Sequence, residues 1–354
     1  MHDRYFPSYT IGKNAFSKFN DVCKKLGHNF LMVGGETALS VAADKLLENI
    51  SESFNLIDKV IYGKECYEDR VLELYNMYKE ENTDFVVGVG GGKAIDTSKY
   101  LAHLLGVPII TVPTIASTCA AASALSVVYS KNHAFEKFVH YKKPAFHCFI
   151  DTEIIANAPY EFLRAGIGDT LAKHYEVEFS SRGRNLDYSS EFGLTLSSMC
   201  NTPLKRNAVS AIAACKANKI NNELENVVLA IIISTGIVSM LINPDYNGAL
   251  AHALFYGLTN IKGFEEKFLH GDVVGYCTAV QLAVDKNMNE AKEIVKFLKS
   301  LNIETTLGER NIPCDFLFLN DVLESALNDP DMRIIPYKVT KEMLFDGICA
   351  VENL

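Results

Sequence analysis

A glycine-rich turn, GVGGGKAID at residues 88–96, stands where an apolar run gives way to a helical pattern. Glycines there let the backbone approach a ligand closely, and free N–H groups at a helix N-terminus attract an anion such as a diphosphate. Lys93 replaces the third glycine of G-x-G-x-x-G, and the gap and ending of a Walker A loop are absent. By itself the turn fits either a phosphate-binding loop or a tight connection that needs glycine only for positive φ.

A second loop, PTIASTCAAASALSVVY at residues 113–129, is dominated by small and hydroxylated residues and follows another apolar run. Ligands of open α/β sheets bind beyond the carboxyl ends of the strands, where both loops emerge. The alternative interpretation is a helix N-cap followed by a segment of small residues that serves packing alone.

The first 150 residues alternate short apolar runs with amphipathic stretches, which predicts βαβ units and a parallel sheet covered on both faces. The expected strands are 30–33, 59–62, 84–89 and 107–112, with helices at 36–49, 66–80 and 93–105.

After about residue 158, long helical patterns replace the strand signals. We therefore predict an α/β domain over residues 1–158 and an all-helical domain over residues 159–354, with Pro159 at the junction. The expected helices are 170–182, 186–199, 203–216, 224–242, 248–258, 272–284, 290–301 and 341–351. The apolar stretch 227–242 is shorter than the roughly 20 residues of a membrane span, so we interpret it as a buried core helix.

The composition is that of an ordinary globular enzyme, with 48% hydrophobic residues and a net charge of -9. Nucleic-acid-binding domains are usually basic, so we expect no nucleic-acid partner. Because we interpret residues 227–242 as a core helix, we also expect no membrane partner. The nine scattered cysteines form no C-x-x-C pair and the N-terminus has no apolar signal region, so we expect reduced thiols and a cytoplasmic protein.

The two loops together resemble the glycerol dehydrogenase branch of the iron-containing alcohol dehydrogenase family. The resemblance continues through GIGDTLAKHYE (166–176), GALAHALFYGLT (248–259) and FLHGDVVGYCTAVQL (268–282), and so covers about residues 30–285. It implies a dehydroquinate synthase-like fold, in which a nucleotide-binding α/β domain precedes a helical domain and a divalent metal lies in the cleft between them. The implied function is hydride transfer between NAD and a small alcohol or polyol, resembling glycerol or dihydroxyacetone. We also expect a homo-oligomer.

By motif, the family's metal ligands fall on Asp169, His252 and His270. Two imidazoles and a carboxylate leave coordination positions open for substrate, as a catalytic site needs. The trio suits Zn²⁺ or Fe²⁺, and we favour zinc because this branch usually uses it. Each residue also has a structural interpretation: Asp169 as a helix N-cap, His252 as a core histidine and His270 as a cap.

The resemblance also assigns cofactor contacts. Those around the diphosphate are Gly91, Gly92, Lys93 and Asp96, and those around the nicotinamide half are Thr114, Ser117, Ser123, Leu125 and Tyr129. The alternative for Lys93 and Asp96 is an i,i+3 pair on a solvated helix face.

Two positions depart from the family. Cys119 occupies the place of an aspartate that hydrogen-bonds a substrate hydroxyl, and a thiol is a weak hydrogen-bonding group, so a less polar or a phosphorylated alcohol becomes a candidate substrate. Gly35 occupies the place of the aspartate that holds the adenosine ribose, and the missing carboxylate allows NADP.

Three other functions remain open. An sn-glycerol-1-phosphate dehydrogenase needs a basic phosphate clamp, which we do not identify. A sugar-phosphate cyclase of the dehydroquinate synthase type conflicts with the second loop. A non-enzymatic relative would bind only nucleotide and metal.

Overall fold

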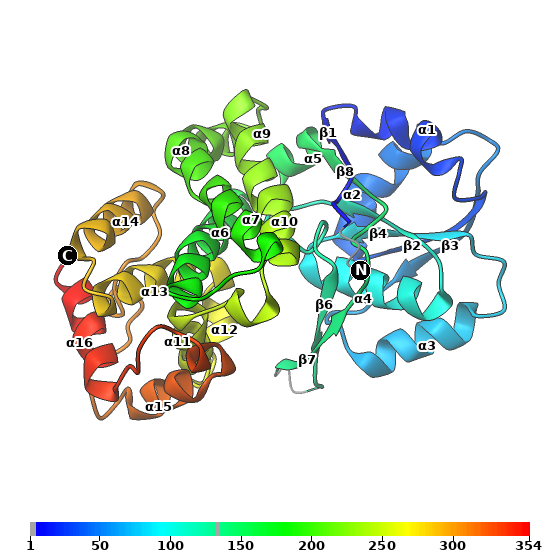
Figure 1. Cartoon of the computed structure of the whole chain (residues 1–354). Helices are drawn as coiled ribbons and strands as arrows, with labels where there is room; N and C mark the ends of the chain where they lie inside the picture. Colours follow the sequence, from blue (N-terminus) through cyan, green and yellow to red (C-terminus); the bar gives the residue numbers. More distant parts are fainter. Residues whose placement is uncertain (1–4, 132–134) are drawn as a thin grey trace. The chain divides into compact units, whose positions relative to one another are not determined.

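The computed structural model describes residues 5–131 and 135–354. The chain divides into two compact units (Figure 1). The first contains the residues up to Pro159 together with Ala214–Val228, and the second contains Tyr160–Ala213 and Leu229–Leu354.

The first unit is built on a parallel sheet of six strands in the order β1-β8-β5-β4-β2-β3. An antiparallel pair, β6-β7, stands apart from it. The strands are β1 (Tyr9–Gly12), β2 (Asn29–Gly34), β3 (Asn55–Ile61), β4 (Phe85–Gly90), β5 (Ile109–Pro113), β6 (Leu125–Tyr129), β7 (Phe135–His140) and β8 (His147–Asp151).

Helices cover both faces of this sheet because its central strands are apolar on both sides. In β2, Phe30 and Met32 belong to one hydrophobic cluster while Leu31 and Val33 belong to the other, following the two-residue period of a strand. Helices α1 and α2 pack on the first face, and α3 and α4 on the second. The helices are α1 (Phe19–Cys23), α2 (Glu36–Leu47), α3 (Glu68–Tyr78), α4 (Gly92–Leu105) and α5 (Thr152–Asn157).

The strand order predicts where this unit binds a ligand. The chain runs outward from β2 to β3 and then returns to the other side of β2 to form β4, so the order reverses between β2 and β4. Such a switch point is where open α/β sheets bind nucleotides. The carboxyl ends of these two strands lie side by side, with Gly34 paired to Val89, and they lead into α2 and α4.

The four strands expected from the sequence are confirmed, and four more are present. β1, β7 and β8 received no prediction. β1 has only four residues, and β7 alternates exposed and half-buried residues. β6 lies at the end of the second loop, where the abundance of small residues concealed it.

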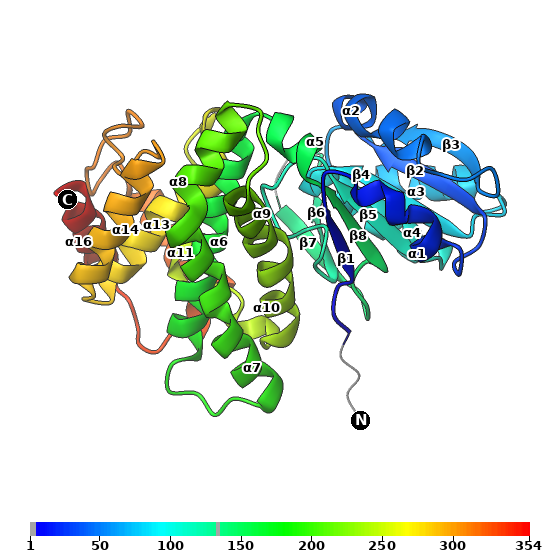
Figure 2. The ribbon, with the colours of Figure 1, turned by 90° about the horizontal axis from the view of Figure 1, so that it is seen from above.

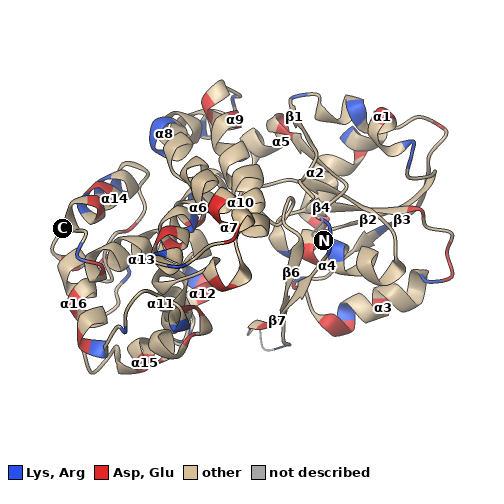
Figure 3. Ribbon diagram, viewed as in Figure 1, with Lys and Arg blue, Asp and Glu red and all other residues tan. Residues whose placement is uncertain are grey.

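Residues 160–354, all of them described, form helices and no strand (Figure 2). The α-helices are α6 (Tyr160–Ser181), α7 (Tyr188–Leu196), α8 (Thr202–Lys216), α9 (Asn222–Leu229), α10 (Thr235–Leu241), α11 (Leu250–Leu258), α12 (Phe264–Lys267), α13 (His270–Val284), α14 (Met288–Ser300), α15 (Asn320–Asn328) and α16 (Lys341–Glu352). Figure 3 shows acidic and basic residues interspersed along these helices.

One helical segment, Asn222–Leu241, is long and apolar enough by length and composition to cross a membrane. It contains a π-helical turn, Ala230–Ser234, between α9 and α10. Of its most apolar window, 61% is buried inside the structure, which agrees with the core helix expected from the sequence.

Candidate metal centre and nucleotide-binding loops

The second unit brings Asp169, His252 and His270 together from three helices, α6, α11 and α13. One ligand atom of each residue lies within 4.8 Å of the other two. The Nε2 atoms of both histidines are 3.3 Å from the same carboxylate oxygen, Oδ1 of Asp169. The His270 side chain is 41% exposed, so the group is open to solvent on one side. Two imidazoles and one carboxylate with an open side fit a catalytic divalent cation.

Glu176 orients one of the two histidines. It is fully buried, and its Oε2 lies 2.6 Å from Nδ1 of His252. Its Oε1 accepts hydrogen bonds from the backbone N–H groups of Ala249 and His252, at 3.0 and 2.9 Å. A carboxylate at Nδ1 favours the tautomer that carries its proton there, which leaves Nε2 as the donor toward a metal.

The charges around His252 attract a cation. Burial alone would lower the pKa of His252, but the carboxylates of Glu176 and Asp169 raise this pKa to about 10. Burial would raise the pKa of Asp169, but hydrogen bonds from His252 and His270 hold this pKa well below its usual value. Two ionised carboxylates thus flank His252, and their negative charge would attract a divalent metal ion.

Two glycines allow the helices that carry Asp169 and His270 to touch. A Cβ atom on Gly271 would overlap the carbonyl oxygen of Ala165, and one on Gly168 would overlap the carbonyl oxygen of Gly271. Beside this contact, Arg164 and Asp272 form a two-pronged ion pair between α6 and α13. The predicted helix start at residue 170 is wrong, and so is the alternative interpretation of Asp169 as its N-cap. The helix begins at Tyr160 and continues through both glycines of Gly166–Gly168, because α13 packs there against bare backbone.

We expect Glu176→Gln to weaken metal binding by about 10- to 100-fold, the usual effect of losing a carboxylate that supports a ligating histidine. Glutamine can still hydrogen-bond the backbone groups, but it removes the charge that fixes His252. Competition with a chelator, followed by metal analysis of the protein, measures the change.

The matched control is Glu178→Gln on the same helix, because the side chain of Glu178 is 52% exposed and points to His174 at 3.6 Å. Equal metal retention by the two variants would show that Glu176 does not support the metal site.

In the first unit, the glycine-rich turn forms the start of α4. Gly90 has a φ of +145°, which favours glycine, and Gly91 is the N-cap. A Cβ on Gly91 would lie 2.8 Å from Cδ1 of Ile115, and one on Gly92 would lie 3.2 Å from Oγ1 of Thr118. These glycines therefore also allow the second loop to pack directly on the helix N-terminus. The two loops meet, as expected of neighbouring strands β4 and β5.

A buried lysine holds the second loop in place. Nζ of Lys99 lies 2.9 Å from Oδ1 of Asp96 and donates hydrogen bonds to the carbonyl oxygens of Ala120, at 2.8 Å, and Leu125. It also reaches the Ser123 hydroxyl at 3.3 Å. Asp96 and Ser123, two of the predicted cofactor contacts, thus point toward Lys99 inside the unit.

The i,i+3 pair that forms on α4 joins Asp96 to Lys99, and the alternative pairing of Lys93 with Asp96 on a solvated face is wrong. Lys93 lies 2.5 Å from the buried carboxylate of Glu65, and its Nζ is 5.8 Å from the centre of the Tyr129 ring. The other predicted cofactor contacts, Ser117, Leu125 and Tyr129, are half-buried, and Thr114 is buried beside Gly90.

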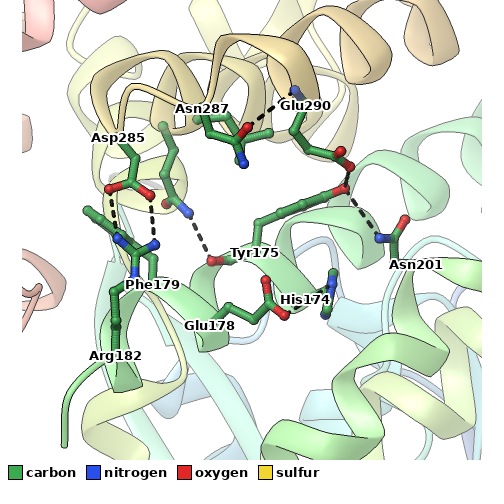
Figure 4. Close-up of a pocket in the computed structure, with 11 residues that line it drawn as sticks. His174, Tyr175, Glu178, Phe179, Arg182, Asn201, Asp285, Asn287 and Glu290 are labelled. Carbon is green, nitrogen blue, oxygen red and sulfur yellow. Dashed lines mark hydrogen bonds and ion pairs between the residues drawn. The ribbon is translucent and has the colours of Figure 1, made fainter.

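A polar cavity of about 280 Å³ in the second unit is separate from the metal candidates (Figure 4). His174, which the sequence places five residues after Asp169, lines it together with Tyr175 and Asn201. Its charged groups are paired with one another or with neighbours: Arg182 with Asp285, and Glu290 with Lys205. Arg182, Asp285 and Glu290, three of the charged side chains that line the cavity, are therefore already paired.

Sequence similarity to known proteins covers nearly the whole chain. A family described as iron-containing alcohol dehydrogenase matches residues 7–152. The glycerol dehydrogenase of Thermotoga maritima is 33% identical, with 98% of this chain and 96% of the relative covered. The chain belongs to the iron-containing alcohol dehydrogenase family. Glycerol dehydrogenase 1 of Schizosaccharomyces pombe is 32% identical over 99% of this chain and 79% of the relative. The crystal structure of glycerol dehydrogenase from that yeast has a TM-score of 0.87 at 29% identity, covering 100% of this chain and 91% of that one.

The protein is therefore a glycerol dehydrogenase-like oxidoreductase that acts on the CH–OH group of a small alcohol. The same comparisons support the dehydrogenase over the alternatives of a glycerol-1-phosphate enzyme and a sugar-phosphate cyclase. They also agree with the predicted fold of an α/β part followed by a helical part.

Sequence reasoning missed Glu176 and Lys99. The spacing of each residue carried a signal. Glu176 follows Asp169 by seven residues, or two turns, and helical residues seven apart lie on one face. Lys99 follows Asp96 by three positions, the spacing of a helical ion pair. Neither signal says what the far end of the side chain reaches.

Proposed function

We propose that the enzyme transfers hydride between a small alcohol and NAD and that Asp169, His252 and His270 hold its catalytic metal. The observation that carries the proposal is the convergence of these three side chains, from positions 83 and 18 residues apart, on one open site backed by Glu176. We favour Zn²⁺, since two imidazoles and a carboxylate are among its usual catalytic ligands. When bound, such a cation lowers the pKa of a substrate hydroxyl.

The protein's own groups prepare this chemistry. Asp169 supplies the negative charge that balances the cation, and Glu176 holds the His252 ring so that Nε2 faces the site. In the first unit, the N–H groups at the start of α4 are placed to bind a dinucleotide diphosphate, and Lys99 orders the loop that we assign to the nicotinamide half. We accordingly propose that the first unit binds the cofactor and that the second binds the metal.

The enzyme could accept NADP as well as NAD, because Gly35 stands where the family has an aspartate that binds the ribose. Gly35 is the N-cap of α2, at the sheet's switch point, and a Cβ there would lie 3.3 Å from Cε1 of Tyr62. An aspartate there would need the Tyr62 ring to shift by a few tenths of an ångström. No carboxylate at position 35 repels a 2′-phosphate, although Glu36 follows directly.

A carbonyl screen tests the proposal. Metal-stripped protein is reloaded with Zn²⁺ or Fe²⁺ and assayed for NADH and NADPH oxidation with dihydroxyacetone, its phosphate and simple aldehydes. We expect metal-dependent NADH oxidation, restored best by Zn²⁺. Activity that does not depend on added metal would refute the metal assignment. A strong preference for NADPH would refute the NAD assignment. Light scattering and cell fractionation test the homo-oligomer and the cytoplasmic location, which we include in the proposal.

We expect Cys119→Asp to raise kcat/KM for glycerol by about 10- to 100-fold, the worth of a hydrogen bond to a charged group. Cys119 lies half-buried in the second loop, and its carbonyl oxygen accepts hydrogen bonds from the N–H groups of Ala122 and Ser123. The substitution changes only the side chain of that turn. Steady-state kinetics with glycerol and a simple primary alcohol measure the effect.

Cys119→Ser serves as the control, because it supplies a hydroxyl without charge. If Cys119→Asp left the preference between glycerol and the simple alcohol unchanged, residue 119 would not select the substrate.

A further inference from the structure

Two cysteines near the C-terminus lie in contact. Sγ of Cys314 is 3.9 Å from Sγ of Cys349. Cys314 is exposed in the segment before α15, and Cys349 is half-buried on α16. Cys119 is also half-buried, while the other six cysteines are buried.

The contact between the two sulfur atoms is held by the packing around them. One helical turn before Cys349, the ring of Phe345 meets that of Phe316 edge-to-face, with centroids 5.2 Å apart. Three residues after Cys349, Glu352 accepts hydrogen bonds from the N–H groups of Leu307 and Gly308, at 2.7 and 3.3 Å. The segment that carries Cys314 is therefore docked on α16 on both sides of the cysteine pair. A disulfide needs about 2.05 Å between the sulfurs, so the pair must close by about 2 Å.

We propose that Cys314 and Cys349 form a reversible disulfide that clamps the segment before α15 to α16. With a low-molecular-weight disulfide as oxidant, one cysteine thiolate attacks it and releases one thiol as a mixed disulfide forms. The second cysteine then attacks the protein sulfur of this mixed disulfide and releases the second thiol. Two protein thiols lose their protons and two electrons to the small disulfide, which leaves as two thiols.

The surroundings favour a slow but durable bond. Partial desolvation beside α16, followed by the neighbouring Cys349, raises the pKa of Cys314 to about 12. Little Cys314 thiolate is present near neutral pH, so Cys314 is not the reactive cysteine of a redox catalyst. A thiol of high pKa is also a poor leaving group, so the bond once formed resists reduction. The cross-link would close the loop 314–349, which contains α15 and most of α16.

The test uses the full-length protein, incubated with oxidised glutathione or with a reducing agent. Peptide mapping without reduction is expected to show the Cys314 peptide joined to the Cys349 peptide. The Tm is expected to rise by about 5–10 °C, because a loop of this length is constrained in the unfolded chain. Dithiothreitol should reverse both changes.

Cys314→Ser and Cys349→Ser should each abolish the linked peptide and the Tm shift, whereas Cys119→Ser should keep both. Reduced forms of the variants show whether they fold like the wild type. The proposal is overturned if glutathione remains attached to Cys314 without linkage, or if linkage leaves the Tm unchanged. Neither result bears on the proposed dehydrogenase activity, which the carbonyl screen tests separately.

Discussion

Asp169→Asn should deprive the protein of its metal and lower kcat/KM by roughly 1000-fold or more. The substitution keeps the shape of the side chain but removes the only negative charge among the three donors. In the wild-type protein, one carboxylate oxygen of Asp169, Oδ1, lies 3.3 Å from the Nε2 atoms of both His252 and His270. Stabilisation of charge by a catalytic metal is worth several kcal/mol, and each 1.4 kcal/mol is about tenfold in rate.

Elemental analysis of the purified variant and steady-state kinetics with NADH measure the two losses. Asp321→Asn is the control, because Asp321 is an exposed carboxylate at the start of α15 in the same unit. Circular dichroism shows whether the variant is folded. A folded Asp169→Asn protein with a full complement of metal would contradict the assignment of Asp169 as a ligand.

The second large effect is expected from Gly271→Ala. The added methyl group would overlap the carbonyl oxygen of Ala165 and lie 3.1 Å from Cβ of Asp169. Backbone cannot rotate away as a side chain can, so α6 and α13 must separate. We expect a loss of about 3 kcal/mol or more in the free energy of unfolding, at the upper end of the cost of overpacking a core. The metal should also be lost, because Asp169 and His270 stand on the two helices that move apart.

Urea unfolding and metal analysis measure these changes. Gly308→Ala is the matched control, since the nearest atoms to its added carbon are 3.8 and 3.9 Å away and its φ is not in the left-handed region. Its effect should stay within about 1 kcal/mol. If Gly271→Ala were as mild as the control, the close contact of these helices would not position the site.

The sequence was sufficient for the architecture because the signals of secondary structure are local. Continuous apolar runs predicted β2, β4 and β5, and the helical period predicted the second unit. The local signals failed where packing overrode them: the glycines in Gly166–Gly168 suggested a helix start, yet α6 runs through them because α13 needs bare backbone there.

The candidate metal ligands were reached through motif resemblance, because no spacing rule joins positions 169, 252 and 270. Aspartate and histidine side chains can donate to a metal in any fold, so the sequence alone determined which chemistry these three residues offer. Only the tertiary structure decided that their ligand atoms lie within 4.8 Å of one another and that Glu176 supports His252. The physical reason is that a donor's chemistry belongs to one side chain, whereas a site depends on how distant helices pack.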